Sequence, residues 1–433
     1  MKIVFTTLAT ALLTTAVWAQ TKQTDSLLQK EIALNEVFVS ALRATKAMGV
    51  SFSNVKAEDF EARNLGQDLP ILLQYLPGVV TTSDAGAGIG YTGIRVRGSD
   101  ATRVNVTING IPYNDPESQG TFWVNLPDFG SSVSSVQLQR GVGTSTNGAG
   151  AFGASLNIST KDAVPEASAQ IRSAVGSFNT LNNSVQFNTG LLNNDFSLSG
   201  RLSRIVSDGY IDRASARLSS YFLQGTYQKG STTLKGLLFG GHEVTYQAWN
   251  GIDAQTLNEN RRFNPSGMYT DANGLMQFHD KEEDNYKQDH AQLHWNEVLA
   301  DGWNAQFALH FTRGRGYFEQ YKSQETDILE IGLPSETPTD LIRRRWLDNR
   351  FYGFTTAVTK KTNQGQVILG GALNKYEGAH FGEVIWAQHM GTAHIGDRYY
   401  DDFSTKIDAN IYLKWQQQFG QKWTSFVDLQ YRG

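Results

Sequence analysis

Apolar and polar residues alternate in long segments through the second half of the chain, from about residue 166 onward. In one such segment the apolar positions are Trp303, Ala305, Phe307, Leu309 and Phe311, with mostly polar residues between them. Each segment therefore has one apolar face and an opposite face that is too polar for a dry core. This pattern is typical of strands that meet lipid on one side and water or a polar domain on the other.

The alternation predicts about eleven strands. They lie near residues 167–176, 181–189, 195–207, 217–229, 231–243, 286–299, 302–316, 348–361, 364–378, 403–418 and 421–431. Their connections alternate in length, which a soluble sandwich does not require. Short turns are expected at 229–230, 300–301, 362–363 and 420–421, and long loops at 244–285, 317–347 and 379–402. Transmembrane barrels combine short periplasmic turns with long external loops, so the lengths assign the two sides.

A different pattern occupies residues 76–160, where short alternating runs are separated by Gly, Asn, Asp and Pro. One run ends at Asn109 and Gly110, which supply a tight turn because both residues tolerate positive φ. Short helices are expected just before, over 55–63 and 65–76, and Asp68 is suited to cap the second. This part is therefore predicted to be a compact α+β domain built on short strands.

The order of the motifs in this domain resembles the plug domain of TonB-dependent outer-membrane receptors. An IRVRG strand at 94–98 is followed by VTINGIP at 106–112, a V-x-x-V-x-L-x-RG segment at 133–141 and a glycine-rich segment at 147–158. The plug-motif residues are Arg95, Arg97, Gly98, Asn109, Gly110, Arg140, Gly141 and Gly153. Two positions depart from the family, because Asn109 replaces the usual Asp and Gln137 a usual Glu. Neither change alters the predicted turn or strand.

The resemblance implies a domain organisation. Residues 1–19, with Lys2 and a short apolar run, are expected to be a signal peptide, too short for a membrane-spanning anchor. Residues 20–41 would form a periplasmic segment, 42–162 the plug domain and 163–433 a partial outer-membrane barrel. The segment 36–41 looks like the TonB box, an extended stretch that pairs edge to edge with TonB. Its residues are Glu36, Val37, Phe38, Val39, Ser40 and Ala41. The alternative is an ordinary first strand of the plug.

The expected fold is an α+β plug domain followed by a transmembrane antiparallel β-barrel of the 22-stranded class, about half of it present. About eight strands make a barrel that its own side chains fill, whereas about 22 leave a lumen that a domain can plug. An unclosed sheet edge in lipid would leave backbone groups unpaired at several kcal/mol each. We therefore expect the sequence to be a truncated N-terminal part of a receptor that does not insert alone.

Composition excludes several other classes. The chain of 433 residues has net charge −4 and no Cys, so nucleic acid is not an expected partner and disulfide or Cys–metal sites are absent. The glycine-rich runs at 85–91 and 140–148 lack the Gly-Lys-Ser/Thr ending of a phosphate loop. Acidic residues and His are scattered without the spacing of a catalytic constellation. No enzyme activity, catalytic residue, cofactor or metal site is predicted.

The resemblance implies active uptake of a scarce solute, a ferric siderophore or other iron complex, across the outer membrane of a Gram-negative bacterium. The partners would be TonB with its inner-membrane energising complex, outer-membrane lipid around a multi-pass barrel, and a small-molecule or metal-chelate substrate. Haem, cobalamin and oligosaccharide importers of the same family remain alternatives. So do two other classes, a passive porin and a surface adhesin, although neither needs a plug with a coupling segment.

Candidate ligand contacts lie in loops expected to face outward. Tyr91 and the group Tyr113, Asn114 and Glu117 belong to two such loops of the plug; packing against the barrel wall is the alternative role. His380, His389 and His394 lie in the predicted loop 379–402. Imidazoles there could meet haem iron or a transition metal, but their spacing fixes no coordination geometry, and solvated loop histidines are the alternative. Arg95 and Arg97 could bind an anion, but their position in the family implies plug–barrel contacts.

Overall fold

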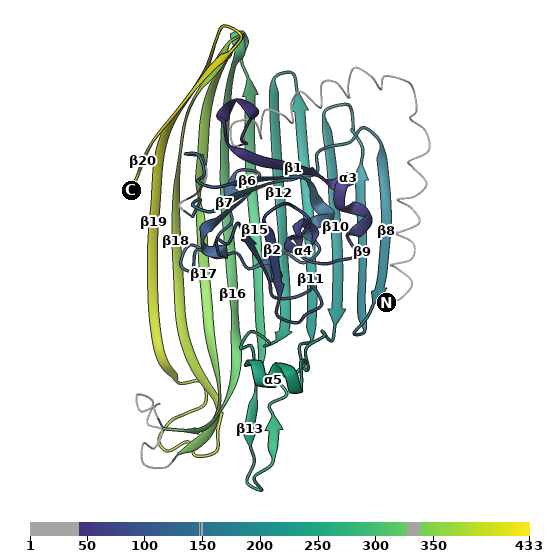
Figure 1. Ribbon diagram of the computed structural model, residues 1–433, viewed down its shortest axis with the longest axis vertical. Helices are drawn as coiled ribbons and strands as arrows, with labels where there is room; N and C mark the ends of the chain where they lie inside the picture. Colours follow the sequence, from purple (N-terminus) through teal and green to yellow (C-terminus); the bar gives the residue numbers. More distant parts are fainter. Residues whose placement is uncertain (1–42, 147, 149, 327–337) are drawn as a thin grey trace. The chain divides into compact units, whose positions relative to one another are not determined.

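The computed structural model describes residues 43–433 except 147, 149 and 327–337 (Figure 1). The chain divides into two units, Met1–Glu36 and Val37–Gly433, and all described residues belong to the second. The predicted signal peptide and the predicted TonB box, residues 36–41, lie outside the described part.

Residues 43–162, here called the plug, form a five-stranded mixed sheet in the order β1-β6-β7-β4-β5, and β2 and β3 pair as a separate hairpin. Among the described strands of this domain, only β4 and β7 run parallel to each other. The strands are β1 (Ser51–Lys56), β2 (Val79–Ser83), β3 (Thr92–Val96), β4 (Val104–Ile108), β5 (Ile111–Pro112), β6 (Val133–Arg140) and β7 (Ala154–Thr160). The helical segments are η1 (Lys46–Met48), α3 (Ala57–Phe60), η2 (Glu61–Arg63), α4 (Leu69–Leu73), η3 (Ala101–Arg103), η4 (Trp123–Asn125) and η5 (Phe129–Ser132).

Every residue of β4 is buried, although its sequence alternates between apolar and polar positions. Both of its polar side chains form hydrogen bonds inside the plug, although the side-chain nitrogen of Asn105 has no partner there. Asn105 accepts a hydrogen bond from the Gly148 N–H at 2.9 Å, and Thr107 donates to the Asn157 side chain at 2.9 Å. A buried polar group is tolerated when it is hydrogen-bonded. The alternation in β4 therefore belongs to a strand that is buried on both faces, not to one with a solvent-exposed face.

The helix that begins at Asp68 is shorter than predicted, and Asp68 does not cap it through its side chain. The carboxyl group turns instead to the hydroxyl of Thr92, which donates to it at 2.8 Å, while its other oxygen has no hydrogen-bond partner. Burial raises the pKa of Asp68 to about 8, and the hydrogen bond from Thr92 opposes this rise.

Replacing Asp68 with asparagine is expected to remove a pH dependence of stability. The folded-state pKa of about 8 lies above the unfolded value, so the contribution of Asp68 to the free energy of unfolding is fully present below about pH 4. This contribution of Asp68 decreases as pH rises and is lost once pH has passed about 8. Unfolding temperatures of the complete receptor, measured from about pH 5 to about pH 9, should fall less for Asp68→Asn than for wild type. Parallel curves would contradict this.

The second sheet, here called the wall, contains eleven antiparallel strands, as the alternation predicts, and each strand pairs with its neighbour along the chain. They are β8 (Ala167–Gly176), β9 (Thr180–Thr189), β10 (Phe196–Ser207), β11 (Ala216–Lys229), β12 (Thr232–Tyr246), β15 (Glu283–Val298), β16 (Trp303–Glu325), β17 (Thr339–Thr362), β18 (Gly365–Ala387), β19 (Arg398–Phe419) and β20 (Trp423–Arg432). Between β12 and β15 lie α5 (Ala254–Glu259) and a small hairpin of β13 (Met268–Thr270) and β14 (Met276–Phe278).

Two of the long loops predicted from the sequence are wrong in extent. β16 and β17 together take up most of 317–347, and β18 and β19 take up much of 379–402. In these strand ends neither face needs to be apolar, so the alternation that marks the rest of the strands fades there. Aromatic pairs stabilise them instead, for example Trp346 stacked on Phe381 with ring centroids 5.7 Å apart.

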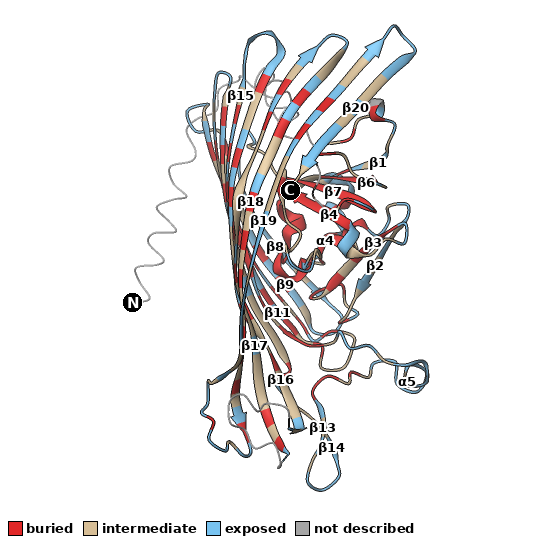
Figure 2. Cartoon of the chain, turned by 90° about the vertical axis from the view of Figure 1, so that its left-hand side faces the viewer, coloured by how far each residue is buried: buried red, intermediate tan, exposed pale blue. Residues whose placement is uncertain are grey.

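The plug lies against one face of the wall, which curves around it (Figures 1 and 2). Buried polar side chains on this face meet the plug; Gln292, for example, lies 3.4 Å from the Asn109 amide nitrogen. The alternate positions, such as Leu293, Leu309 and Phe311, are exposed on the other face. Trp303, Phe419 and Trp423 are exposed beside the short turns, where aromatic residues of a membrane interface are expected. Among the described residues, no helix is long and apolar enough to cross a membrane.

Candidate functional site

A cavity of about 410 Å³ lies between the plug and one end of wall strands β12 and β15–β19. The plug contributes Tyr91, the segment 112–116, Phe122 and Asn125. The wall contributes side chains from six strands and from Trp249 after β12. Most of the large side chains are aromatic. They are Tyr91, Tyr113, Phe122, Trp249, Tyr286, Tyr317, Phe318, Trp346, Phe351, Tyr376 and Tyr400. A concave, largely aromatic site with a few polar groups is the usual form of a small-molecule site.

The structure brings most of the predicted ligand residues to this cavity. Tyr91, Tyr113, Asn114 and His380 line it. Glu117 accepts hydrogen bonds from two of the lining residues, Tyr376 and His380. The sequence placed His380 in a loop, but it lies in β18, where it pairs with Asp402 of β19.

The other two histidines are elsewhere. His389 and His394 lie in the connection between β18 and β19 and do not line the cavity. Their backbone N–H groups donate to Thr339 and Asp397, respectively. No group of three or more His, Asp or Glu side chains within the described residues is arranged to hold a metal ion.

Asn114 is engaged within the plug. Its side-chain oxygen accepts the Val106 N–H at 2.6 Å, and its nitrogen donates to the carbonyl oxygens of Val104 and Gln119, each at 2.9 Å. The amide therefore ties the segment after β5 to β4. Its contribution to the cavity is mainly to hold Tyr113 and the following turn in position.

One end of the cavity holds two carboxylates that the sequence analysis missed. The hydroxyl of Tyr91 lies 3.3 Å from Glu243 of β12 and makes a shorter contact with Asp284 of β15. Burial, followed by the two neighbouring carboxylates, raises the pKa of Tyr91 well above its usual value. Neither carboxylate forms an ion pair with a basic residue in the described part of the chain. The Tyr91 hydroxyl has one proton, so it can donate to only one of the two carboxylates at a time.

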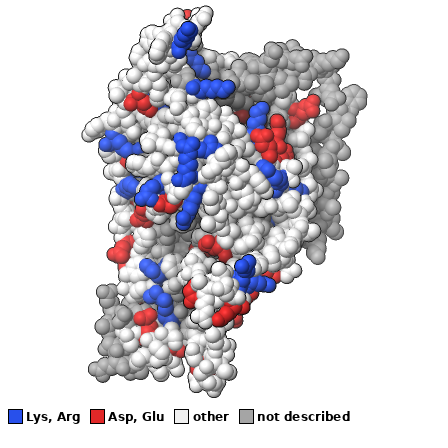
Figure 3. All heavy atoms as spheres, viewed as in Figure 1, with Lys and Arg blue, Asp and Glu red and all other residues white. Residues whose placement is uncertain are grey.

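The basic group of the cavity is Arg345 of β17. Its guanidinium lies over the rings of Phe318 and Tyr400, 5.3 and 5.7 Å from their centroids, and its Nε donates to the Tyr400 hydroxyl at 3.3 Å. Asp115, Glu243 and Asp284 also line the cavity, and Arg345 is the one arginine among its described lining residues. The face drawn in Figure 3 carries both signs of charge interspersed.

The plug-motif residues hold the plug's own turns. Asn109 and Gly110 both have positive φ, 52° and 85°, as the predicted tight turn requires. A Cβ at Gly153 would lie 2.3 Å from the Cβ of Ser99, so only glycine fits there. The Arg140 side chain donates to the Pro77 carbonyl at 2.9 Å. The remaining members of the set also lie at turns or on the plug surface: Gly98 and Gly141 have positive φ, and Arg95 and Arg97 are exposed.

Gln137, one of the two departures from the family pattern, fixes the first described residues of the chain. Its side-chain oxygen accepts the Ala44 N–H at 2.6 Å and its nitrogen donates to the Ala44 carbonyl at 3.0 Å. Arg43 donates to the side chains of Ser135 and Ser159 at 2.9 and 3.1 Å. The chain just after the predicted TonB box is thereby attached to β6 and β7.

The contact between plug and wall differs from one side to the other. Against β10–β12 it includes an aromatic cluster, in which Phe129 of the plug packs on Phe222 and Phe239 with centroids 6.4 and 5.5 Å away. Beside these rings, Arg201 of β10 forms a fully buried ion pair with Asp128 at 2.9 Å.

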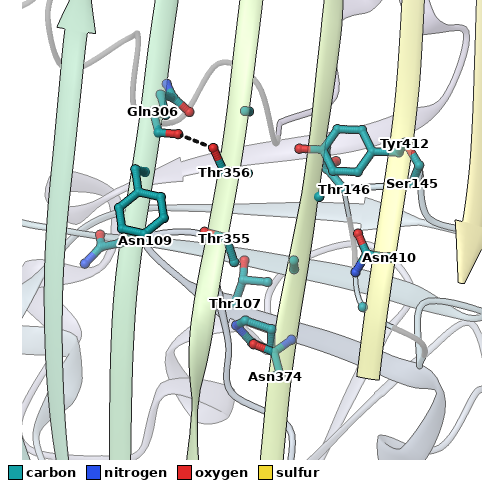
Figure 4. A pocket seen from close by; sticks show the side chains of 18 of the residues that line it. Thr107, Asn109, Ser145, Thr146, Gln306, Thr355, Thr356, Asn374, Asn410 and Tyr412 are labelled. Carbon is teal, nitrogen blue, oxygen red and sulfur yellow. Dashed lines mark hydrogen bonds between the residues drawn. The ribbon is translucent and has the colours of Figure 1, made fainter. Parts of the chain in front are cut away.

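Against β15–β19 the contact is polar and encloses a small cavity of about 70 Å³. Figure 4 shows hydroxyl and amide side chains around it, contributed by both plug and wall. The labelled residues are Thr107, Asn109, Ser145, Thr146, Gln306, Thr355, Thr356, Asn374, Asn410 and Tyr412.

Comparison with known proteins agrees with this architecture. Residues 44–155 match the model of the TonB-dependent receptor plug domain. No curated protein matches the sequence. The ferripyoverdine receptor of the outer membrane of Pseudomonas aeruginosa superposes with a TM-score of 0.62 at 11% identity, over 88% of this chain and 51% of that receptor. Unliganded FecA, a ferric citrate transporter, gives 0.64 at 13%, over 93% and 60%. The copper transporter OprC gives 0.66 at 12%, over 88% and 55%.

The fold is thus that of plugged outer-membrane receptors, and the chain spans between half and about three fifths of the solved receptors it matches. Residues 44–155 match a TonB-dependent receptor plug domain, and the sheet that follows has the fold of the solved outer-membrane receptors.

Proposed function

We propose that the complete protein takes up a scarce metal chelate, a ferric siderophore or related iron complex, across the outer membrane with energy supplied through TonB. The observation that carries the proposal is the cavity that the plug and wall share. A ligand there touches Tyr91 and Tyr113 of the plug and also the aromatic residues of the wall. Its binding can therefore change the contact between the two parts, which a passive porin or an adhesin does not require.

The histidines of the cavity favour recognition of an intact chelate over direct binding of the metal. The Nε2 atom of His380 lies 2.7 Å from the Glu117 carboxylate. The two ring nitrogens of His290 contact Thr312 and Gln288, and its ring stacks on Phe239 with centroids 4.7 Å apart. The groups that remain available to a ligand are aromatic faces, hydroxyls and carboxylates, and these recognise the organic part of a complex.

The charges of the cavity favour a neutral or cationic chelate. Asp115 and Asp284 outnumber Arg345, and the rings of Trp249, Tyr286 and Trp346 can face a cation. An anionic complex would be repelled by these carboxylates, because solvent and salt screen charge repulsion only weakly in a partly enclosed site.

The experiment measures binding of two ferric complexes of similar size to the complete receptor in outer-membrane vesicles. One is a cationic ferric trihydroxamate that carries a free amine, and the other is an anionic ferric tris-catecholate. We expect the cationic complex to bind at least about tenfold more tightly. Asp284→Asn should reduce this preference, whereas Glu58→Gln, which changes an exposed carboxylate on α3, should leave it unchanged. Tighter binding of the tris-catecholate would contradict the proposed charge preference, and binding of neither complex would contradict an iron-chelate substrate.

A further inference from the structure

Residues 113–121 of the plug, here called the apex segment, form a turn held by its own hydrogen bonds. The side chain of Asp115 accepts the N–H groups of Glu117 and Ser118 at 3.1 and 2.7 Å. The Gln119 N–H donates to the Asp115 carbonyl at 2.9 Å. Because the turn is fixed by its own hydrogen bonds, the carboxylate of Glu117 is held out toward the wall.

Three side chains of the wall converge on this carboxylate. The Tyr376 hydroxyl and the Nε2 atom of His380, both on β18, each lie 2.7 Å from its Oε2 atom, and Ser404 of β19 donates to Oε1. Next to them, the Lys406 ammonium group donates to the Pro116 carbonyl at 2.7 Å. Burial raises the pKa of Glu117, but the hydrogen bonds from Ser404, Tyr376 and His380 outweigh it and bring the pKa below its usual value. The carboxylate is therefore held in its charged form.

The same residues belong to the cavity. Tyr376 and His380 line it, and hydrogen bonds connect Tyr376 through Asn349 to Tyr286 of β15, another lining residue. The Tyr286 hydroxyl donates to the Asn349 side-chain oxygen at 3.0 Å, and the Asn349 nitrogen donates to the Tyr376 hydroxyl at 3.4 Å. A ligand that accepts a hydrogen bond from Tyr376 or His380 competes directly with Glu117. A ligand that engages Tyr286 or Asn349 disturbs the hydrogen bonds that orient Tyr376.

We propose that Glu117 is a positioning residue that latches the apex segment to β18 and β19, and that Tyr376 and His380 transmit occupancy of the cavity to this latch. The inference rests on the proposed function for its ligand, but the latch itself exists without one. When a ligand draws Tyr376 or His380 toward itself, the apex segment loses hydrogen bonds to the wall. The plug is then less firmly held on its outward side.

The test is hydrogen exchange of the apex segment, measured by mass spectrometry on the complete receptor in membranes without ligand. We expect Glu117→Ala to speed exchange of residues 113–121 by at least about tenfold, because three hydrogen bonds to a charged group are lost. The double change Tyr376→Phe with His380→Ala should have a similar effect from the cavity side. Glu117→Gln, which keeps the size of the side chain and one acceptor oxygen, should give a smaller increase.

Two controls separate the latch from general loosening. Tyr400→Phe alters another cavity residue, whose hydroxyl bonds to Arg345 rather than to the plug, and should leave exchange of the apex segment unchanged. Exchange of β6 and β7 should stay slow in every variant, which shows that the plug remains folded. Wild-type exchange in Glu117→Ala would overturn the latch. Wild-type exchange in the Tyr376 and His380 variant, or equal loosening by Tyr400→Phe, would overturn transmission through those residues. None of these readouts depends on uptake, so failure here is distinct from failure of the proposed function.

Discussion

Replacing Arg201 with alanine is expected to weaken the attachment of the plug to the wall by about 3–5 kcal/mol, the usual cost of breaking a buried ion pair from one side. The guanidinium lies 2.9 Å from Asp128, and the two side chains are 3% and 1% exposed. It also donates to Ser132 and Ser220 at 2.9 and 3.2 Å. Alanine would leave the Asp128 carboxylate buried, with Ser131 as its remaining donor at 2.6 Å.

The loss can be measured as hydrogen exchange of residues 128–133 in the complete receptor, which should become roughly a hundredfold faster or more. The matched control is Arg217→Ala. Arg217 also bonds a carboxylate, Glu283 at 2.7 Å, but its side chain is 56% exposed, so its loss should cost less than about 1 kcal/mol. The combined change Arg201→Met with Asp128→Ala should come closer to wild type than Arg201→Ala alone, because no unpaired charge remains. Equal effects of Arg201→Ala and Arg217→Ala would show that the pair does not hold the plug.

Much of the fold could be predicted because its requirements are local. The apolar face of each wall strand must repeat every second residue, and this period alone gave the eleven strands. The turn at Asn109 and Gly110 follows from two residues that tolerate positive φ. The ends of β16–β19 could not be predicted, because the period fades there. Asp68 does occupy the N-cap position of α4, but its carboxyl group bonds Thr92 instead of the helix, and that contact depends on the tertiary fold.

The site was predicted mainly on the side of the plug, and on the side of the wall only His380 was named, in a loop rather than in β18. Tyr91 and Tyr113 could be found because the plug motifs indicate which of its loops face outward. Glu243 and Asp284 could not, since they are about forty residues apart and meet only because β12 pairs with β15, in a register that sets Glu243 opposite Tyr286. The contact of Glu117 with His380 spans 263 residues and joins a plug turn to a strand. A single sequence carries no local signal for such pairs.

Deleting residues 36–41 from the complete receptor is expected to have the largest effect of all, the loss of energised uptake. These residues precede Arg43 and Ala44, which are bonded to β6 and β7, so a pull on them would reach the central sheet of the plug. The cavity is lined by other residues of the plug and by the wall. Binding of a ligand should therefore not require residues 36–41. Deletion of residues 22–27, an equally long and mostly polar stretch that is farther from the plug along the sequence, serves as the control.

The decisive measurement is uptake of a radioactive ferric chelate by cells that carry the complete receptor, compared with binding of the same chelate to their membranes. We expect the 36–41 deletion to abolish accumulation and keep the wild-type affinity, and the 22–27 deletion to change neither. Accumulation that continues without residues 36–41 would contradict transport coupled through TonB.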